Sequence, residues 1–340
     1  MTKTLCGFIL AAALGIMDAQ AGVLRHCDPP VDQSATQQDR LLRMSALVRD
    51  RLAALGSNVA MVARSGLNLS WWDQRYSHAG LSLRHNPSGP WFIRQLYYDC
   101  TARQPRIFDE GLAGFVSGVA DPDHNYLLVL ALPASTLKGA AGSEEEHSAP
   151  DVSIERLALH GPTALGLLGS QYSANAHAFS TRFQNCNQWL IELLALGLQP
   201  DAARGATPNA ARGATTRGLH DEGGDPDQGD VSRLRSGAQA LLREQGYIPT
   251  TFSLGHPLIT WFAGRIPWLS LEDHPREDLQ QNRLRVSMPA SIAAHLLAQV
   301  PSITRIEACL KDARIVMREN GPPLDDHCSA MPGDQVLALD

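Results

Sequence analysis

A single cysteine stands where a helix is expected to begin, and its position makes it the first candidate for chemistry. The stretch from Thr181 to Ala195 carries Cys186 just before a run of apolar residues at helical spacing. A helix N-terminus bears about half a positive charge on its unpaired N–H groups, and this charge lowers the pKa of a nearby thiol. The sequence therefore predicts that Cys186 is a nucleophilic thiolate. Taken alone, a cysteine is more often a small buried residue or half of a disulfide.

The start of this helix has two interpretations. The spacing of a capping box occurs twice, at Thr181 with Gln184 and at Asn185 with Gln188. Only the second pair places Cys186 in the first turn. Acyl transfer also needs donors for an oxyanion, and the backbone N–H of Cys186 would supply one, with Asn185 or Gln184 nearby. The simpler interpretation makes Asn185 a helix cap and Gln184 a solvated residue.

A histidine near the start of a predicted β-hairpin is the second candidate. Two apolar runs flank the Pro-Ser-Gly cluster at residues 87–89, which predicts a hairpin turn there. With that turn, His78 lies opposite Tyr97, and Gln95 and Asp99 share its face, one step to either side. A histidine held by a carboxamide or a carboxylate is an oriented general base. Both Gln95 and Asp99 are open as the orienting residue, and a plain hydrogen-bonded strand histidine is the alternative.

Apolar periodicity elsewhere predicts the elements that must position these residues. Helical spacing and proline or glycine boundaries mark the helices, and shorter alternating or continuous apolar runs mark the strands. The expected helices are residues 36–55, which Gly56 ends, 107–119, 231–245 and 289–300, and the expected strands are 58–64, 126–132 and a terminal hairpin over 303–317.

The N-terminal residues have the pattern of a secretory signal peptide. Lys3 precedes an apolar stretch from Leu5 to Met17, and a small-x-small cleavage site ends at Ala21. The apolar stretch is short for a bilayer span, and no later stretch is apolar for long enough to form one. We therefore expect a periplasmic or secreted protein without a transmembrane segment.

A low-complexity segment divides the expected core in two. Residues 200–207 are almost repeated by residues 208–215, and the run on to Asp230 is rich in Gly, Asp and Arg. Such a segment buries little apolar surface, so we expect it to be disordered. The expected organisation is a signal peptide at 1–21, a first core part at 22–198 with the histidine hairpin and the cysteine helix, the insert at 199–230, and a second core part at 231–340.

Charge and motif content limit the partners. The net charge is −6, and no basic stripe is present, which argues against nucleic acid. No group of His, Cys, Asp and Glu has metal-ligand spacing, and no Gly-rich phosphate loop follows a strand. The sequence therefore predicts neither a metal nor a cofactor, and a small-molecule, peptide or cell-wall substrate as the partner. The oligomeric state is left open.

The cysteine count of the mature chain is odd. After signal cleavage it would keep Cys27, Cys100, Cys186, Cys309 and Cys328. In an oxidising compartment, two disulfides and one free thiol are the economical solution. We expect Cys186 to be the free thiol, and Cys309 and Cys328 are candidates to close the terminal hairpin.

The order of the two motifs resembles a known superfamily. Ser77-His78-Ala79-Gly80 comes early and Asn185-Cys186-Asn187 late, which is similar to the circularly permuted branch of the NlpC-type papain-like proteins, including relatives of lecithin:retinol acyltransferase. Residues 59–85 and 179–195 resemble more closely an exported bacterial family known only as a domain of unknown function. The resemblance extends over about residues 23–320, interrupted by the insert.

The resemblance implies an α+β, papain-like fold with an antiparallel sheet packed on helices and the nucleophile at a helix N-terminus. It implies Cys186 as the nucleophile, His78 as the base and Gln95 as the orienting residue, where relatives often have histidine. The expected function is an exported cysteine-dependent hydrolase or acyltransferase that acts on an amide or ester bond, with a cell-wall peptide among the candidate substrates. The alternative is a non-catalytic binding or structural envelope protein on a decayed papain-like scaffold.

Overall fold

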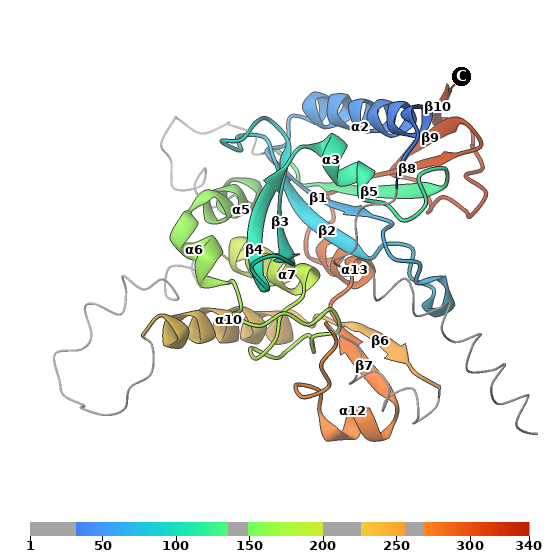
Figure 1. The fold of residues 1–340 in the computed structure, drawn as a ribbon. Helices are drawn as coiled ribbons and strands as arrows, with labels where there is room; N and C mark the ends of the chain where they lie inside the picture. Colours follow the sequence, from blue (N-terminus) through green and yellow to red (C-terminus); the bar gives the residue numbers. More distant parts are fainter. Residues whose placement is uncertain (1–31, 135–148, 200–225, 256–267, 340) are drawn as a thin grey trace, which may run out of the picture.

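An antiparallel sheet of eight strands crosses the centre of the fold (Figure 1). The computed structural model describes residues 32–134, 149–199, 226–255 and 268–339. The strands follow the spatial order β10-β9-β8-β5-β1-β2-β3-β4. They are β1 (Val59–Arg64), β2 (His78–Leu83), β3 (Phe92–Asp99), β4 (Gln104–Glu110), β5 (Asn125–Ala131), β8 (Thr304–Lys311), β9 (Arg314–Glu319) and β10 (Gln335–Ala338).

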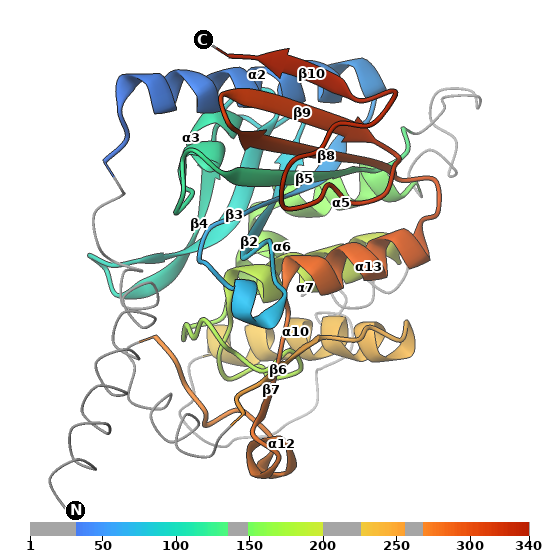
Figure 2. The ribbon, with the colours of Figure 1, turned by 90° about the vertical axis from the view of Figure 1, so that its right-hand side faces the viewer.

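Helices cover both faces of this sheet (Figure 2). One apolar cluster joins the sheet to α2 (Ala35–Leu55) and α3 (Leu112–Ser117), and the other joins it to α5 (Pro150–Leu159), α6 (Gly161–Gly166), α7 (Cys186–Leu198), α10 (Pro226–Glu244) and α13 (Pro289–Gln299). A smaller unit consists of α12 (Arg276–Gln280) and a two-stranded sheet of β6 (Thr250–Ser253) and β7 (Arg283–Val286). The short 3₁₀ helix η2 (Ser70–Trp72) lies between β1 and β2. The fold is therefore mixed α+β, as expected.

Strand β1 shows why helices must cover both faces of the sheet. Met61 and Ala63 of β1 belong to the cluster with α7, whereas Ala60 and Val62 belong to the cluster with α2. Successive side chains of a strand point to opposite faces, so an unbroken apolar run is stable only when both faces are covered. All six residues of β1 are buried.

Several local expectations are confirmed. Helix α2 ends at Gly56, whose φ of 74° is the left-handed conformation that glycine adopts without strain. Pro289 opens α13. The terminal hairpin is present as β8 and β9, with Asp312 and Ala313 at positive φ in its turn.

The expected helix over residues 107–119 is wrong in its first half. Residues 107–110 belong to β4, and the helix α3 covers only Leu112–Ser117. Cross-strand pairing with β3 prevails over local helical preference here, because Arg94 Nε of β3 donates to Asp109 Oδ1 at 2.8 Å. Gly111 then separates the strand from α3 as its N-cap.

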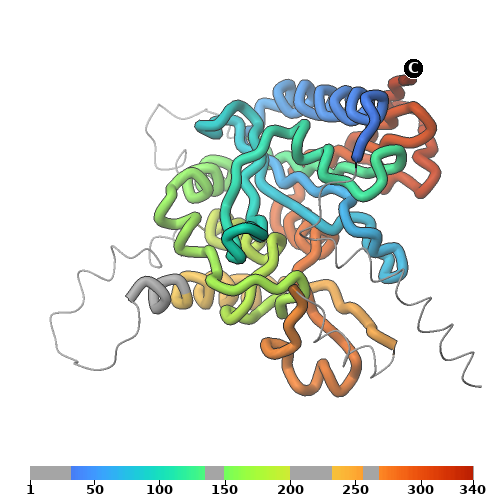
Figure 3. The backbone as a smooth tube through the Cα atoms, in the orientation of Figure 1, coloured from blue at the N-terminus to red at the C-terminus, as the bar shows by residue number. Residues whose placement is uncertain are grey.

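The two expected core parts contribute to one sheet. Figure 3 follows the chain as its C-terminal part returns to the sheet, where β8 pairs with β5. The signal peptide at 1–21, Cys27 and residues 200–225 of the insert lie outside the described residues. The expected end of the insert at residue 230 is wrong, because residues 226–230 belong to α10. Among the helices that the structure describes, none is both long and apolar enough to cross a bilayer.

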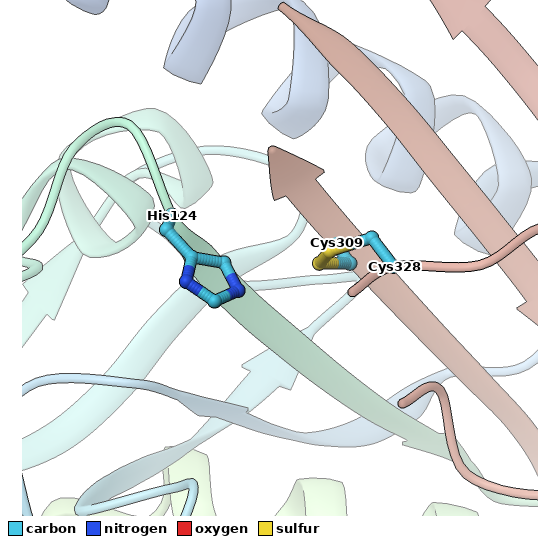
Figure 4. Close-up of side chains that lie close together, drawn as sticks. All are labelled: His124, Cys309 and Cys328. Atoms are coloured by element: carbon cyan, nitrogen blue, oxygen red, sulfur yellow. A yellow bond between two sulfur atoms is a disulfide. The ribbon is translucent and has the colours of Figure 1, made fainter. Parts of the chain in front are cut away.

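A disulfide joins the terminal hairpin to the segment that follows it. Cys309 of β8 is bonded to Cys328, as the cysteine count suggested, with the two Cα atoms 5.9 Å apart. His124 lies beside this bond, and within the described ranges these are the three residues that bring metal-ligand atoms to within 4.8 Å of one another (Figure 4). Because both sulfurs are in the disulfide, neither offers the thiolate that a metal site needs. Cys100 is also disulfide-bonded.

Removing this disulfide is expected to destabilise the fold. The two cysteines are separated by 19 positions and fully buried, so the Cys309→Ala/Cys328→Ala variant should lose about 3 kcal/mol of unfolding free energy through the freer unfolded chain. Urea denaturation checks this. An unchanged midpoint would show that the bond does not constrain the unfolded state.

Candidate active site

Helix α7 begins at Cys186, so the second of the two capping interpretations holds. Asn185 is the N-cap with extended backbone angles, and its Oδ1 accepts from the backbone N–H of Gln188 at 2.7 Å. The rest of the helix is buried almost entirely. Cys186 is a free cysteine at the tip of this helix, as expected.

The polar side chains of Gln184 and Asn185, just before Cys186, make hydrogen bonds within the fold. The Oε1 atom of Gln184 accepts from Gly169 N at 2.7 Å, and its Nε2 donates to Leu167 O at 2.9 Å. The Nδ2 atom of Asn185 donates to Ala174 O at 3.2 Å. Gln184 is therefore buried rather than solvated, and the backbone N–H groups of Cys186 and Asn187 are the first-turn donors at the sulfur.

The expected lowering of the thiol pKa is wrong. Burial raises the pKa of Cys186 to about 12, because a thiolate is costly to form away from water. The backbone N–H groups of Asn187 and Cys186 and the positive charge of Arg64 act in the opposite direction, but they are outweighed. Cys186 is therefore a protonated thiol at neutral pH and needs a base before it can attack.

His78 is the first member of a hydrogen-bonded chain across three strands. His78 Nε2 lies 2.6 Å from Gln95 Oε1 on β3, and Gln95 Nε2 donates to Glu110 Oε2 on β4 at 2.7 Å. Because the Glu110 carboxylate accepts only, it fixes the amide with its oxygen toward the ring. His78 then carries its proton on Nε2, which leaves Nδ1 as the nitrogen with a lone pair.

Asp99, the other residue considered for this place, has a different role. Its Oδ1 accepts from the backbone N–H groups of Thr101 and Ala102, both at 2.9 Å, and its Oδ2 lies 3.3 Å from Arg106. The bond from Ala102 holds the pKa of Asp99 below its usual value. Asp99 therefore stabilises the turn between β3 and β4, and Gln95 alone of the two contacts His78.

The tip of α7 and the start of β2 are joined by a hydrogen bond. Asn187, next to Cys186, donates through Nδ2 to the carbonyl of Ser77, next to His78, at 3.2 Å. Ala79 packs in the cluster that contains Cys186, whereas the ring of His78 lies 5.7 Å from that of Phe115 on the opposite face. His78 is the first residue of β2, so the imidazole lies at the end of the strand, on the face opposite to the cluster that contains Cys186.

Aromatic rings continue from the thiol toward the smaller unit. The negative charge that Cys186 would carry helps raise the pKa of Tyr172, after burial as the main cause. Tyr172 contacts Tyr98 with ring centroids 5.3 Å apart, and Tyr98 contacts Trp268 at 4.4 Å. Tyr172, Tyr98 and Trp268 thus form a continuous row of ring contacts.

A buried ion pair anchors α7 behind the site. Glu192 of α7 and Arg235 of α10 lie 2.9 Å apart, and both side chains are fully buried. Arg235 also donates to the carbonyls of Thr181 and Phe183 in the segment that leads to Cys186. This network fixes the helix and its preceding segment together.

Two buried histidines hold the neighbouring segment. The backbone N–H of His177 donates to Asp273 Oδ2 at 2.9 Å, and His274 Nε2 lies 2.8 Å from the carbonyl of Asn175. The two rings are 5.5 Å apart. Burial, the largest cause, lowers the pKa of both histidines.

Acid is expected to destabilise the protein through these groups. In the unfolded chain each histidine takes up a proton at about pH 6.5, whereas His177 and His274 resist it when folded. As the pH falls from that value toward their native pKa values, the unfolded state binds more protons and the unfolding free energy decreases. Urea denaturation across this window checks the slope. In His274→Asn this slope should be shallower.

Sequence reasoning missed two residues of this site. Glu110 was expected within a helix, and only its pairing in β4 brings it to Gln95. Arg64 was expected as the end of an ordinary strand, although it is buried and its Cα pairs with that of His78. The burial of Arg64 could not be predicted, because no local sequence pattern distinguishes a buried arginine at a strand end from an exposed one.

Comparison with known proteins identifies a matching protein family. Residues 51–296 match the model of a family described as uncharacterized protein conserved in bacteria (DUF2145). No curated protein matches the chain. No solved structure matches it either. The matched residues include His78, Gln95, Glu110 and Cys186. The chain therefore belongs to the bacterial family of unknown function DUF2145.

Proposed function

We propose that the chain is an exported, cysteine-dependent hydrolase or acyltransferase that acts on an amide or ester bond from a papain-like scaffold. The hydrogen bond from Asn187 to the Ser77 carbonyl carries the proposal, because it holds the neighbours of Cys186 and His78 together. The chain from His78 through Gln95 to Glu110 supports it by orienting the base.

The reaction begins with a protonated thiol. His78 Nδ1 takes the proton as Cys186 attacks the acyl carbon, and the backbone N–H groups of the α7 tip stabilise the oxyanion. The bond to the leaving group then breaks, and the imidazolium gives the leaving group its proton. Water or another acceptor attacks the thioester and passes a proton to His78, which returns it to the departing sulfur.

Export is part of the proposal. The signal-peptide pattern at residues 1–21 supports export. The disulfide between Cys309 and Cys328 also supports it, because disulfides persist in oxidising compartments. A cell-wall peptide is among the amide substrates that such a location would offer.

Acylation by p-nitrophenyl acetate tests the enzyme proposal. The mature protein should gain one acetyl group, located on Cys186 by peptide mapping, with release of nitrophenolate. Cys186→Ala should gain none. An acetyl group that persists in Cys186→Ala would contradict the proposal.

A non-catalytic binding protein on the same scaffold is the second candidate. The thiol pKa of about 12 favours it, since an unactivated thiol is what a decayed site would contain. Absence of acetylation at Cys186 in folded protein would favour this function over the first.

A further inference from the structure

A buried arginine at the end of β1 has no anionic partner among the residues that the structure describes. Arg64, the last residue of β1, is 6% exposed and pairs by its Cα with His78. Within the described ranges, no carboxylate oxygen lies within 4.0 Å of its guanidinium, and its Nε atom is buried without a hydrogen-bond partner. A buried cation is normally paired, because leaving water is costly for a charge.

The groups around Arg64 hold the guanidinium without neutralising it. Its Nη1 donates to the carbonyl of Gly118, and its Cζ lies 5.4 Å from the centroid of the Phe115 ring. Gly118 leaves room for this arrangement, since a Cβ atom there would lie 2.7 Å from Nη2. Arginine has five N–H donors in a planar fork, and only one of them is accounted for by Gly118.

The guanidinium of Arg64 lies close to the other residues of the candidate active site. The ring of Phe115 also contacts His78, with centroids 5.7 Å apart. The charge of Arg64 favours the thiolate of Cys186, which places it within electrostatic reach of the sulfur. At neutral pH the thiol is protonated, so Cys186 does not compensate the charge of Arg64.

We infer that Arg64 makes the reaction at Cys186 selective for acyl donors that carry an anionic group, such as a carboxylate, next to the bond that breaks. This inference rests on the proposed function. The carboxylate would fill the open donors of the guanidinium, while the first-turn N–H groups stay available for the oxyanion. Arginine suits this role because its fork matches a carboxylate in two hydrogen bonds.

Paired alkylating reagents test the selectivity without any turnover. Iodoacetate and iodoacetamide both transfer their methylene to the Cys186 sulfur with loss of iodide, and only iodoacetate carries a carboxylate. At one mildly alkaline pH, the ratio of their rates at Cys186 should exceed the ratio for free cysteine by about tenfold. Propionate should slow the reaction of wild type with iodoacetate.

Variants of Arg64 test whether this residue causes the change in the rate ratio. Arg64→Met should lower the iodoacetate rate more than the iodoacetamide rate and so return the rate ratio to that of free cysteine, and Arg64→Lys should give an intermediate ratio. Arg84→Met, at the exposed arginine that follows β2, should leave the ratio unchanged. If Arg64→Met does not fold, the wild-type ratio and the Arg64→Lys ratio decide.

Three results would overturn the inference. A wild-type ratio equal to that of free cysteine would show no anion recognition. An equal fall of both rates in Arg64→Met would limit Arg64 to stabilising the thiolate. Failure of both reagents to modify Cys186 in folded protein would remove the proposed function itself, together with this inference.

Discussion

We expect His78→Ala to acylate Cys186 with p-nitrophenyl acetate about 10²- to 10⁴-fold more slowly than wild type. Burial raises the pKa of Cys186 to about 12, so almost no thiolate exists at neutral pH without a base. His78 is oriented for this task by Gln95, whose Oε1 lies 2.6 Å from Nε2. Stopped-flow release of nitrophenolate, with intact-mass detection of the acetyl group, measures the rate.

Matched variants separate a base from a structural histidine. His85→Ala should acylate at the wild-type rate, because His85 is an exposed residue whose partner is Glu155. Gln95→Leu and Glu110→Gln should lie between wild type and His78→Ala, since each loosens the orientation of a base that is still present. Equal rates for His78→Ala and wild type would exclude His78 as the base.

Glu192→Ala is expected to lower the unfolding free energy by about 3–5 kcal/mol. The substitution leaves Arg235 fully buried without its counter-charge. It also removes an acceptor for Gln184 Nε2, at 3.0 Å, and for Gln239 Nε2, at 2.7 Å. Urea denaturation monitored by circular dichroism measures the change.

An exposed ion pair provides the control for this prediction. Asp39 and Arg43 form an i,i+4 pair on α2 at 2.7 Å, and both side chains are more than half exposed. Asp39→Ala should therefore change the unfolding free energy by less than about 0.5 kcal/mol. A loss for Glu192→Ala as small as that for Asp39→Ala would mean that α7 is not anchored by the buried pair.

The hairpin could be predicted from sequence because its signals are local. The turn residues and the alternation of two runs fix a register, and the structure pairs Leu81 with Arg94, which continues to His78 opposite Tyr97. The rings of His78 and Tyr97 are 5.2 Å apart. The same locality explains why Gly56 could be predicted as the end of its helix and why Asn185 was one of two candidate caps.

The environment of the candidate site could not be predicted, because it depends on what packs over it. Helix propensity is a local quantity, so it could not predict that Glu110 would belong to strand β4. Gln184 is buried through its hydrogen bonds to Gly169 and Leu167, and the raised pKa of Cys186 follows from its burial, and no local pattern in the sequence reveals either environment. Only the lowering effect of the helix tip was visible in the sequence.

Cross-linking with dibromoacetone tests most directly whether Cys186 and His78 form one site. The reagent has two electrophilic carbons joined through one carbonyl carbon, so it links only side chains that can nearly touch. After one end alkylates Cys186, we predict that the other alkylates His78 Nδ1, which gives a single Cys186–His78 cross-linked peptide that is lost in His78→Ala. A product in which Cys186 carries the reagent without a link to His78 would contradict the account.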